Sequence, residues 1–441
     1  MASRPFDVVL WGCTGFTGRL VAQYFAKRVA KRMPSLRWAL AGRDGAKLEE
    51  LSRSLGGASP PTLLAASHDQ TQMNELAGST RVLLSTAGPF GLHGTPVVEA
   101  CVRGGCDYVD INGETGWHRS MIDRYDDAAR AAGVVLVPSS GFDSIPSDLG
   151  ASWMAERIER ESGLPTRRIS CYVDLRGQFS GGTVASGIHG DMTYGAEYLA
   201  DPFLLGGAPW TMGSHFDEEH ADMVEAATDR LLQSPIAPFG MAPINTRIVR
   251  RTVGLLEDLE PNRHAALFAH DYCYRECLRA PDAATASKLA RAAAAPASKR
   301  SELVAAGRLP SPGMGPDAAT RAESWFKFLF IAEADGPAGA SGNSCFKLAG
   351  TISGGDPGYD ETAKMVSETA VGLLARREDS GQVVDQIGET VQRAAWRRGG
   401  FLTPATALGP LLLDRLHAEG IQFADAALPE GVTSPSPDAF C

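Results

Sequence analysis

A glycine-rich segment near the N-terminus limits what this chain can fold into more than any other part of its sequence. The segment GCTGFTG (12–18) follows the short apolar run FDVVLW (6–11) and precedes residues whose apolar side chains recur at helical spacing. Between a strand and a helix, glycines permit a tight turn and let the backbone approach a pyrophosphate, which the free N–H groups of the helix bind. We therefore expect a cofactor-binding turn; the alternative is a glycine-rich turn without a ligand. The residues expected to hold the cofactor phosphates are Gly12, Thr14, Gly15, Phe16, Thr17 and Gly18.

The first third of the chain alternates between strand and helix patterns. The strand-like runs after the glycine segment are RWALAG, PTLLAA, RVLLSTAG, CDYVDI and VVLVPSSG. Helical segments lie between them, including one that begins at Thr95-Pro96 and ends at Gly104-Gly105. This alternation predicts an α/β fold with a doubly wound parallel sheet, a Rossmann domain over residues 1–147.

The end of the second predicted strand discriminates between NAD and NADP. An NAD-binding domain usually places Asp or Glu there, to bind the ribose 2′-hydroxyl. This strand ends at Arg43, whose guanidinium can hold the 2′-phosphate of NADP through two charge-assisted hydrogen bonds. Lys47 adds positive charge one turn further on, and Asp44 is expected to cap the next helix. These residues predict NADP as the cofactor; the alternative for Arg43 is an ordinary solvated side chain.

A loop of small residues follows the fourth predicted strand. It contains Ala87, Gly88 and Pro89. Loops at the carboxyl ends of strands face the cofactor crevice in sheets of this kind, and small residues let the ribose and nicotinamide lie close to the backbone. We expect cofactor contact here, with a plain Gly-Pro turn as the alternative.

The pattern changes in the second part of the chain. RRISCYVDLRG, INTRIVRRTVG, WFKFLFIAEADG and SCFKLAGTISGG alternate as antiparallel strands with one solvated face do. Because 441 residues exceed the size of one hydrophobic core, they predict a second, mixed α+β domain over residues 148–395, which binds substrate and serves dimerisation. An Ala- and Pro-rich stretch at 279–323 is predicted to be a mobile excursion with short helices, and residues 428–441 a disordered tail.

The candidate catalytic residues lie in SSGFDSIPSD (139–148), at the carboxyl end of the last strand of the first domain. Asp143 or Ser144 can relay a proton or position a substrate; the alternative for Asp143 is the closure of a turn, and Asp148 is expected to cap the next helix. In SGGT (180–183), Ser180 and Thr183 either line a substrate cleft or belong to a tight hairpin. No Tyr-x-x-x-Lys pair occurs in the chain, which excludes that local acid–base motif.

Charge and cysteine usage exclude several classes of protein. The formal net charge of -10 argues against nucleic-acid binding. The eight cysteines form no Cys-x-x-Cys pair and the nine histidines no metal-binding spacing, so no metal site is predicted and a reducing compartment is expected. The sequence shows neither a signal peptide nor a stretch of about 18 apolar residues that could cross a bilayer. We expect a cytoplasmic protein, for which peripheral attachment to a lipid surface stays open.

Several longer segments spread over nearly the whole chain carry a family resemblance. They are GCTGFTGRLVAQY, AGRDGAKLEEL, TAGPFGLHGTPVVEAC, YVDINGE, SGFDSIPSDLG, SGGT, PGMGP, GDPGYDETAKM and GGFLTPATALGPLLLDRL. Together they resemble the saccharopine dehydrogenase-like oxidoreductase family, which includes mycobacterial trans-acting enoyl reductases and animal proteins of lipid droplets. The resemblance implies a Rossmann domain, a mixed α/β domain and a C-terminal segment (396–427) that returns to the first domain, with Phe401, Thr403 and Pro404 near the cofactor.

The resemblance also implies an activity, that of an NADP-dependent oxidoreductase. We expect it to reduce an acyl or lipid-linked substrate, at an enoyl double bond, in lipid or glycolipid metabolism. One alternative is a saccharopine reductase-type dehydrogenase acting on an amino acid, although SSGFDSIPSD departs from the signature of that group. The other alternative is a non-catalytic NADP-binding scaffold at lipid droplets or organelle membranes, which the lack of a recognisable acid–base motif keeps open.

Overall fold

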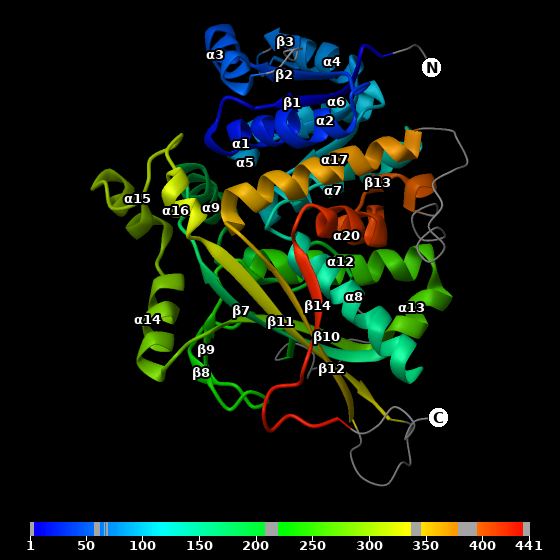
Figure 1. The fold of residues 1–441 in the computed structure, drawn as a ribbon, viewed down its shortest axis with the longest axis vertical. Helices are drawn as coiled ribbons and strands as arrows, with labels where there is room; N and C mark the ends of the chain where they lie inside the picture. Colours follow the sequence, from blue (N-terminus) through cyan, green and yellow to red (C-terminus); the bar gives the residue numbers. More distant parts are fainter. Residues whose placement is uncertain are drawn as a thin grey trace.

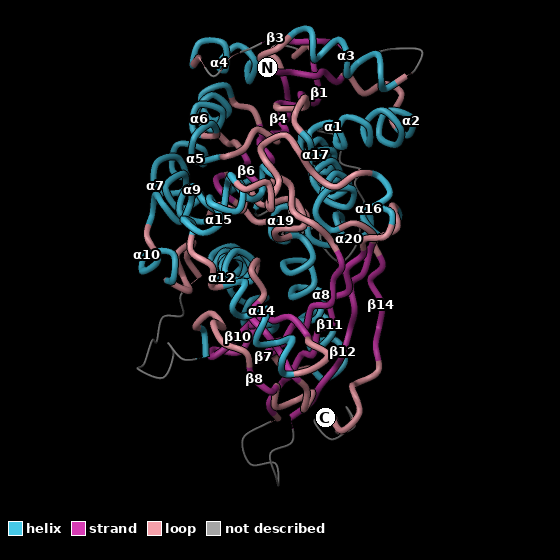
Figure 2. The backbone as a smooth tube through the Cα atoms, turned by 90° about the vertical axis from the view of Figure 1, so that its left-hand side faces the viewer, coloured by secondary structure: helices cyan, strands magenta, loops and turns pink. Residues whose placement is uncertain are grey.

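Two seven-stranded sheets organise the chain in the computed structural model, which describes residues 4–56, 62–65, 67, 69–207, 219–336, 345–377 and 395–434. In Figure 1 one sheet lies at the top and the other at the bottom, with helices between them. Figure 2, turned by 90°, shows the same separation, with α8, α12, α17 and α20 in the middle layer. The fold is therefore α/β in its first part and mixed α+β in its second, as the sequence predicts.

The first sheet is parallel throughout, in the order β13-β6-β5-β4-β1-β2-β3. Its strands are short and mostly buried on both faces, which is why they read as continuous apolar runs. The strand order reverses between β1 and β4, which is where open α/β sheets bind their ligands. The strands are β1 (Phe6–Trp11), β2 (Trp38–Gly42), β3 (Thr62–Ala65), β4 (Thr80–Ser85), β5 (Asp107–Asp110), β6 (Val135–Val137) and β13 (Gly400–Phe401).

Helices cover both faces of this sheet. Those from the first part of the chain are α1 (Phe16–Tyr24), η1 (Phe25–Val29), α2 (Ala30–Arg32), α3 (Gly45–Leu55), α4 (Gln70–Gly78), α5 (Phe90–His93), α6 (Thr95–Gly104) and α7 (Thr115–Ala131). A late pair, η2 (Pro357–Glu361) and α17 (Thr362–Arg377), also joins this layer. Helix α17 packs against β1, β4 and β5, so the core under the sheet is completed by residues far away in the sequence.

The second sheet is mixed, in the order β14-β12-β11-β7-β10-β9-β8. Its pairs are antiparallel except β7 with β10, which run parallel. Strands β7, β11 and β12 coincide with three of the four predicted segments. The strands are β7 (Thr166–Arg176), β8 (Ala227–Thr228), β9 (Pro235–Pro238), β10 (Phe268–Arg279), β11 (Trp325–Asp335), β12 (Cys345–Gly354) and β14 (Gln422–Ala426).

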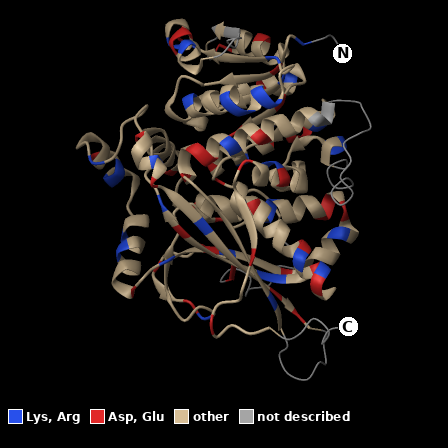
Figure 3. Ribbon diagram, viewed as in Figure 1, with Lys and Arg blue, Asp and Glu red and all other residues tan. Residues whose placement is uncertain are grey.

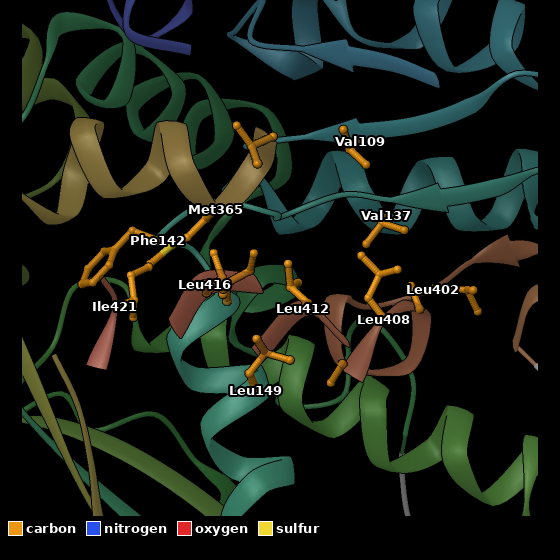
Figure 4. Close-up of a cluster of buried hydrophobic side chains, with 14 of the residues drawn as sticks. Val109, Val137, Phe142, Leu149, Met365, Leu402, Leu408, Leu412, Leu416 and Ile421 are labelled. Atoms are coloured by element: carbon orange, nitrogen blue, oxygen red, sulfur yellow. The ribbon is translucent and has the colours of Figure 1, made fainter. Parts of the chain in front are cut away.

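The remaining helices lie between the sheets and beside the second one. They are α8 (Ile145–Ser162), α9 (Gly181–Tyr194), α10 (Ala196–Ala200), α12 (Ala242–Leu259), α13 (Pro261–Leu267), α14 (Ala283–Ala293), α15 (Ala297–Ala305), α16 (Ala318–Ala322), α19 (Pro404–Ala407) and α20 (Gly409–Ala418). Helices α14 to α16 fall within the Ala- and Pro-rich stretch. Figure 4 shows the hydrophobic cluster of the middle layer, where Leu412 and Leu416 of α20 face Leu149 of α8 and Val137 of β6.

The prediction of a strand at INTRIVRRTVG was wrong, because this segment lies in α12. Its β-branched residues favour a strand, but Ile244 and Ile248 are four residues apart and Pro243 stands in the first helical turn, which also suits a helix. The arginines that looked like the solvated face of a strand are buried. Arg250 and Arg251 donate hydrogen bonds to backbone carbonyls rather than to water.

The C-terminal segment adds the last strand to the first sheet. Strand β13 pairs with β6, and Leu402 N donates to Leu136 O at 2.9 Å. Phe401 is fully buried, its N–H donates to Asp126 Oδ1 at 2.7 Å, and Thr403 caps α19. Of residues 428–441, those up to Ser434 are described, and the rest of the predicted tail lies outside the described residues.

Basic and acidic side chains are mixed on one face of the molecule. Figure 3 shows Lys and Arg interspersed with Asp and Glu on the helices of the visible face. None of the described helices is both long and apolar enough to cross a membrane.

Candidate functional site

Five loops meet at the carboxyl edge of the first sheet. They follow β1, β2, β4, β5 and β6, and they contain the glycine segment, Arg43, the loop 86–89 and the loops 111–114 and 138–144. Because the strands are parallel, their carboxyl ends lie at one edge of the sheet; this edge, where open α/β sheets bind their ligands, is called the crevice. Every residue predicted to bind the cofactor lies on one of the first three loops or in the first turn of the helix that follows it, α1 or α3.

Two of the three glycines in the first loop are required by packing. Gly12 has φ +79°, and a β-carbon there would lie 2.8 Å from Ala87 N. A β-carbon on Gly18 would lie 2.7 Å from both Cys13 Cα and Thr86 Oγ1. The loop after β4 therefore lies directly against the glycine segment, and Thr86 N donates to Trp11 O at 2.9 Å.

Gly15 is different, because it is exposed and open. It precedes α1 with an extended backbone, and the nearest atom to its β-carbon position is Gly12 O at 3.4 Å. Within the described residues no side chain caps α1, so the N–H groups of its first turn are available to an anion. This open cradle, at the positive end of a helix dipole, fits the pyrophosphate of a dinucleotide.

Thr14, Phe16 and Thr17 are half-buried around this cradle. The Phe16 ring packs edge-on against Tyr359 with centroids 5.0 Å apart, and Arg321 lies over it at 5.9 Å. The Phe16 side chain therefore contacts η2 and the approach to α16, while its backbone remains at the helix N-terminus.

Arg43 lies exposed at the end of β2. Burial lowers the pKa of His93 in α5, and the positive charge of Arg43 lowers it further, so Arg43 lies on the crevice side of the loop. Asp44 caps α3 as predicted, since its Oδ1 accepts from Lys47 N at 3.1 Å. Its Oδ2 also lies 3.6 Å from Lys47 Nζ, which holds that ammonium beside the carboxylate.

We expect Arg43→Ala to narrow the preference for NADPH over NADH. The variant loses a charge-assisted pair with the 2′-phosphate, which costs roughly 1.5–3 kcal/mol, about 10- to 150-fold in affinity. Calorimetric titration with each cofactor gives the ratio of the affinities for NADPH and NADH. Arg53→Ala is the matched control, because Arg53 is also an exposed arginine but lies in the last turn of α3. Equal affinities for the two cofactors in the unmutated protein would contradict the role of Arg43.

The loop after β4 is braced by a carboxylate from the loop after β5. Glu114 accepts from Phe90 N at 2.6 Å and from Gly91 N at 2.9 Å, at the start of α5. Gly88 lies close to α9, since its β-carbon position is 3.5 Å from Ser186 Oγ. Pro89 directly precedes α5. Ala87, Gly88 and Pro89 thus lie between the glycine segment and α9.

A second buried carboxylate ties the loops after β5 and β6 together. Asp110 accepts from Asn112 N at 2.8 Å, from Ser139 N at 2.9 Å and from Tyr108 Oη at 2.8 Å. Burial raises the pKa of Asp110 to about 7, despite these hydrogen bonds. Ser139 Oγ adds a bond to Asn112 O at 2.8 Å, so the two loops form one rigid floor.

Three buried polar atoms on this floor have no hydrogen-bond partner in the part of the chain that the structure describes. They are Asp143 Oδ1, Ser144 Oγ and Asn112 Nδ2. The two loops meet at Gly113, whose β-carbon position is 3.4 Å from Asp143 Oδ2. Burial raises the pKa of Asp143 to about 7, and the nearby charge of Glu276 adds to the shift. Unsatisfied buried polar groups are costly unless a partner binds them, so Asp143 and Ser144 stay the predicted catalytic residues.

The prediction that Asp148 caps the next helix was wrong. Asp148 lies inside the first turn of α8, and its Oδ2 accepts from Ala405 N at 2.8 Å while Oδ1 accepts from Thr252 Oγ1. Burial raises its pKa to about 7. The carboxylate therefore holds the C-terminal segment, a contact across more than half the chain that local sequence does not show.

The SGGT segment starts a helix and is not a hairpin. Ser180 is buried and caps α9, accepting from Thr183 N at 3.3 Å, while its N–H donates to Tyr359 Oη. Thr183 is exposed, and its hydroxyl lies 3.5 Å from Tyr359 Oη. Ser180 is thus a structural cap, and Thr183 lies on the first turn of a helix that reaches the crevice.

Sequence reasoning missed Asn112, Glu114, Ser186 and His189. A β-carbon on Gly91 would lie 2.7 Å from His189 Nε2 and 3.0 Å from Glu114 Oε2, so α9 covers the start of α5. The glycines at 181, 182, 187 and 190 argue against a helix and concealed α9. YVDINGE was the available signal for Asn112 and Glu114, since these residues directly follow a predicted strand.

The metal-binding residue types do not gather at the crevice. Among the described residues, no group of three His, Cys, Asp or Glu side chains is placed to hold a metal ion. His215 lies outside the described residues, and His220 is buried against Phe203.

The chain is similar to several known proteins. Residues 8–137 match the family described as saccharopine dehydrogenase NADP binding domain. A predicted trans-acting enoyl reductase of Mycobacterium tuberculosis is 30% identical over 441 residues, covering 96% of this chain and 98% of that protein. A trans-acting enoyl reductase of Mycobacterium bovis is 28% identical, covering 97% and 99%. A solved saccharopine dehydrogenase from Saccharomyces cerevisiae aligns over 96% of this chain and 100% of its own, with 12% identity and a TM-score of 0.47. The chain belongs to the saccharopine dehydrogenase-like family of NADP-dependent oxidoreductases, together with the mycobacterial trans-acting enoyl reductases.

Proposed function

We propose that this oxidoreductase reduces the α,β-double bond of an acyl or lipid-linked substrate in lipid or glycolipid metabolism. The observation that carries the proposal is the set of unpartnered buried atoms on the crevice floor, Asp143 Oδ1, Ser144 Oγ and Asn112 Nδ2. The Asp143 carboxyl group can exchange a proton near neutral pH. Ser144 Oγ and Asn112 Nδ2 are two hydrogen-bond donors. The relatives named as trans-acting enoyl reductases support the same class of reaction.

The reaction needs a hydride and a proton. NADPH, which the glycine segment and Arg43 would hold, would supply the hydride for the β-carbon of the substrate. The α-carbon must then receive a proton, and Asp143, with a pKa of about 7, can hold and release one. Asn112 Nδ2 and Ser144 Oγ can donate hydrogen bonds to the carbonyl oxygen, on which negative charge develops.

The surface around the crevice supports an apolar substrate. Among the described residues, seven large hydrophobic side chains are exposed, and five of them lie on α5, on α9 and α10, or in the segments packed against α9. The five are Leu92, Phe179, Met192, Tyr198 and Met314. Gly181 N donates to Met314 O at 2.9 Å, which places the Met314 loop at the start of α9. Such a gathering is typical of surfaces that contact an apolar ligand. Attachment to a lipid surface and formation of a homodimer stay predictions.

We expect the purified protein to oxidise NADPH when an α,β-unsaturated acyl thioester is added. Short and long acyl chains are compared by the loss of reduced-nicotinamide absorbance, and the saturated product is identified by mass spectrometry. Saccharopine, and aminoadipate semialdehyde with glutamate, are tested in parallel. Activity on these amino acids alone would mean that the substrate is an amino acid and not an acyl compound. Tight NADPH binding without turnover of any substrate would favour a non-catalytic scaffold.

A further inference from the structure

A second pocket lies away from the crevice, between α12, α13 and the start of β10. It holds about 70 Å³ of space for water-sized groups and is partly open to solvent, which suits a small head group whose chain extends outward. The lining contains none of the crevice residues; it includes Arg250 and Glu257 of α12, Tyr272 of β10 and Phe203. The N-terminal half of α12 contacts the crevice floor through Ile244, and its C-terminal half lines this pocket.

The pocket contains a buried cation, the Arg250 guanidinium, whose hydrogen-bond acceptors are all neutral carbonyl groups. Arg250 is 4% exposed, and its Nη1 donates to Pro202 O at 2.8 Å while Nη2 donates to His220 O at 3.0 Å and Tyr274 O at 3.4 Å. Its Nε has no partner, and no carboxylate pairs with its guanidinium, within the described ranges. Burial lowers the pKa of Arg250 to about 10, so it keeps its charge at neutral pH. A buried charge without an opposite charge is unfavourable, and an anion would offset this cost.

A second unsatisfied donor lies in the same lining. Tyr272 is 7% exposed, and its phenolic oxygen has no hydrogen-bond partner among the described side chains and backbone. Burial raises the pKa of Tyr272, so the phenol stays protonated and can donate. Burial also lowers the pKa of His264, and lowers that of His220 to about 4, so both imidazoles are neutral at neutral pH. Glu257, the acidic residue of the lining, is half-buried, which leaves its carboxylate in contact with water.

We infer that this pocket binds a monocarboxylate that carries an apolar chain. One carboxylate oxygen accepts a hydrogen bond from the phenol of Tyr272, and the other accepts one from the Nε–H of Arg250. The two Nη atoms of Arg250 are already occupied by carbonyls, so the bidentate fork that phosphate recognition uses is not available. Phe203 and Val253 offer apolar surface for the chain. The inference is independent of the proposed reaction in the crevice.

Calorimetric titration of the full chain with sodium octanoate tests this site. We expect saturable binding with one ligand per chain, weakened about threefold to tenfold in Tyr272→Phe, the effect of losing one hydrogen bond. Tyr125→Phe, which alters a tyrosine of α7 outside both this pocket and the crevice, is the matched control and should bind as the unmutated protein does. Saturating NADPH should leave octanoate affinity unchanged, which separates this pocket from the crevice.

Three outcomes would overturn the inference. One is the absence of saturable octanoate binding, and another is equal octanoate affinity in the unmutated protein and Tyr272→Phe. The third is tighter binding of hexyl phosphate than of octanoate, which would assign the pocket to phosphates. Thermal unfolding of Tyr272→Phe is recorded alongside, so that a loss of binding in a folded protein is distinguished from a loss of fold.

Discussion

Gly15→Val is expected to abolish NADPH binding without unfolding the protein. The glycine has ordinary extended backbone angles, and no atom lies closer than 3.4 Å to the position of an added β-carbon. The valine side chain therefore meets no protein atoms but occupies the cradle at the N-terminus of α1, where phosphate oxygens would bind. We expect a loss of affinity of at least about 100-fold, roughly 3 kcal/mol, by calorimetry. Circular dichroism and the melting temperature should change little.

Gly18→Val provides the matched comparison, three residues further along the same loop. A β-carbon at Gly18 would lie 2.7 Å from Cys13 Cα and from Thr86 Oγ1, so this variant should lose stability. The two substitutions thus distinguish two roles of glycine. Gly15 leaves space for a ligand, whereas Gly18 leaves space for neighbouring atoms of the protein. If Gly15→Val still bound NADPH with normal affinity, the segment would be only a turn.

Asp143→Ala is expected to lower turnover by roughly 10²–10⁴, the usual size of a general acid–base contribution. NADPH affinity should change little, because Asp143 lies on the loop after β6 and not on the glycine segment. Stability should also change little, since Asp143 Oδ1 has no partner among the described residues. The pKa of about 7 adds a test by pH. A proton donor acts in its protonated form, so turnover of the unmutated protein should fall as the pH rises above about 7.

Asp148→Ala is the control for Asp143→Ala, because both residues are buried aspartates with pKa values of about 7. Asp148 accepts hydrogen bonds from Thr252 and Ala405, so its loss should lower the free energy of unfolding by about 1–3 kcal/mol. Turnover per folded molecule should stay normal. Normal turnover in Asp143→Ala, or equal losses of turnover in the two variants, would remove Asp143 from the reaction.

The sequence allowed prediction of the features that depend on local patterns. The strand before the glycine segment, the helix after it and the cap at Asp44 are each determined within a few residues, and the structure contains all of them. Features that depend on distant partners could not be predicted. The arginines of α12 looked solvated because the carbonyls that bind them, such as Leu205 O and Phe401 O, lie 46 and 150 residues away.

The same distinction applies to the candidate site. The glycine segment and Arg43 follow from one strand–turn–helix unit, whereas the crevice floor needs two loops brought together by Asp110. Asp148 could not be distinguished from a helix cap without its contact with Ala405. Helix α9 was missed because its glycine content opposes local helix formation, and its packing on α5 and α15 stabilises it instead.

The parallel pairing of β13 with β6 has a consequence for the order in which the chain folds during synthesis. Residues 400–401 are synthesised about 260 residues after β6 (Val135–Val137), and until then β6 is an open edge of the first sheet. Open edges pair readily with other strands, which makes incomplete chains prone to aggregate. Helix α17, which covers β1, β4 and β5, is also late. The edge of the nascent N-terminal sheet at β6 therefore stays unpaired until the C-terminal segment closes it.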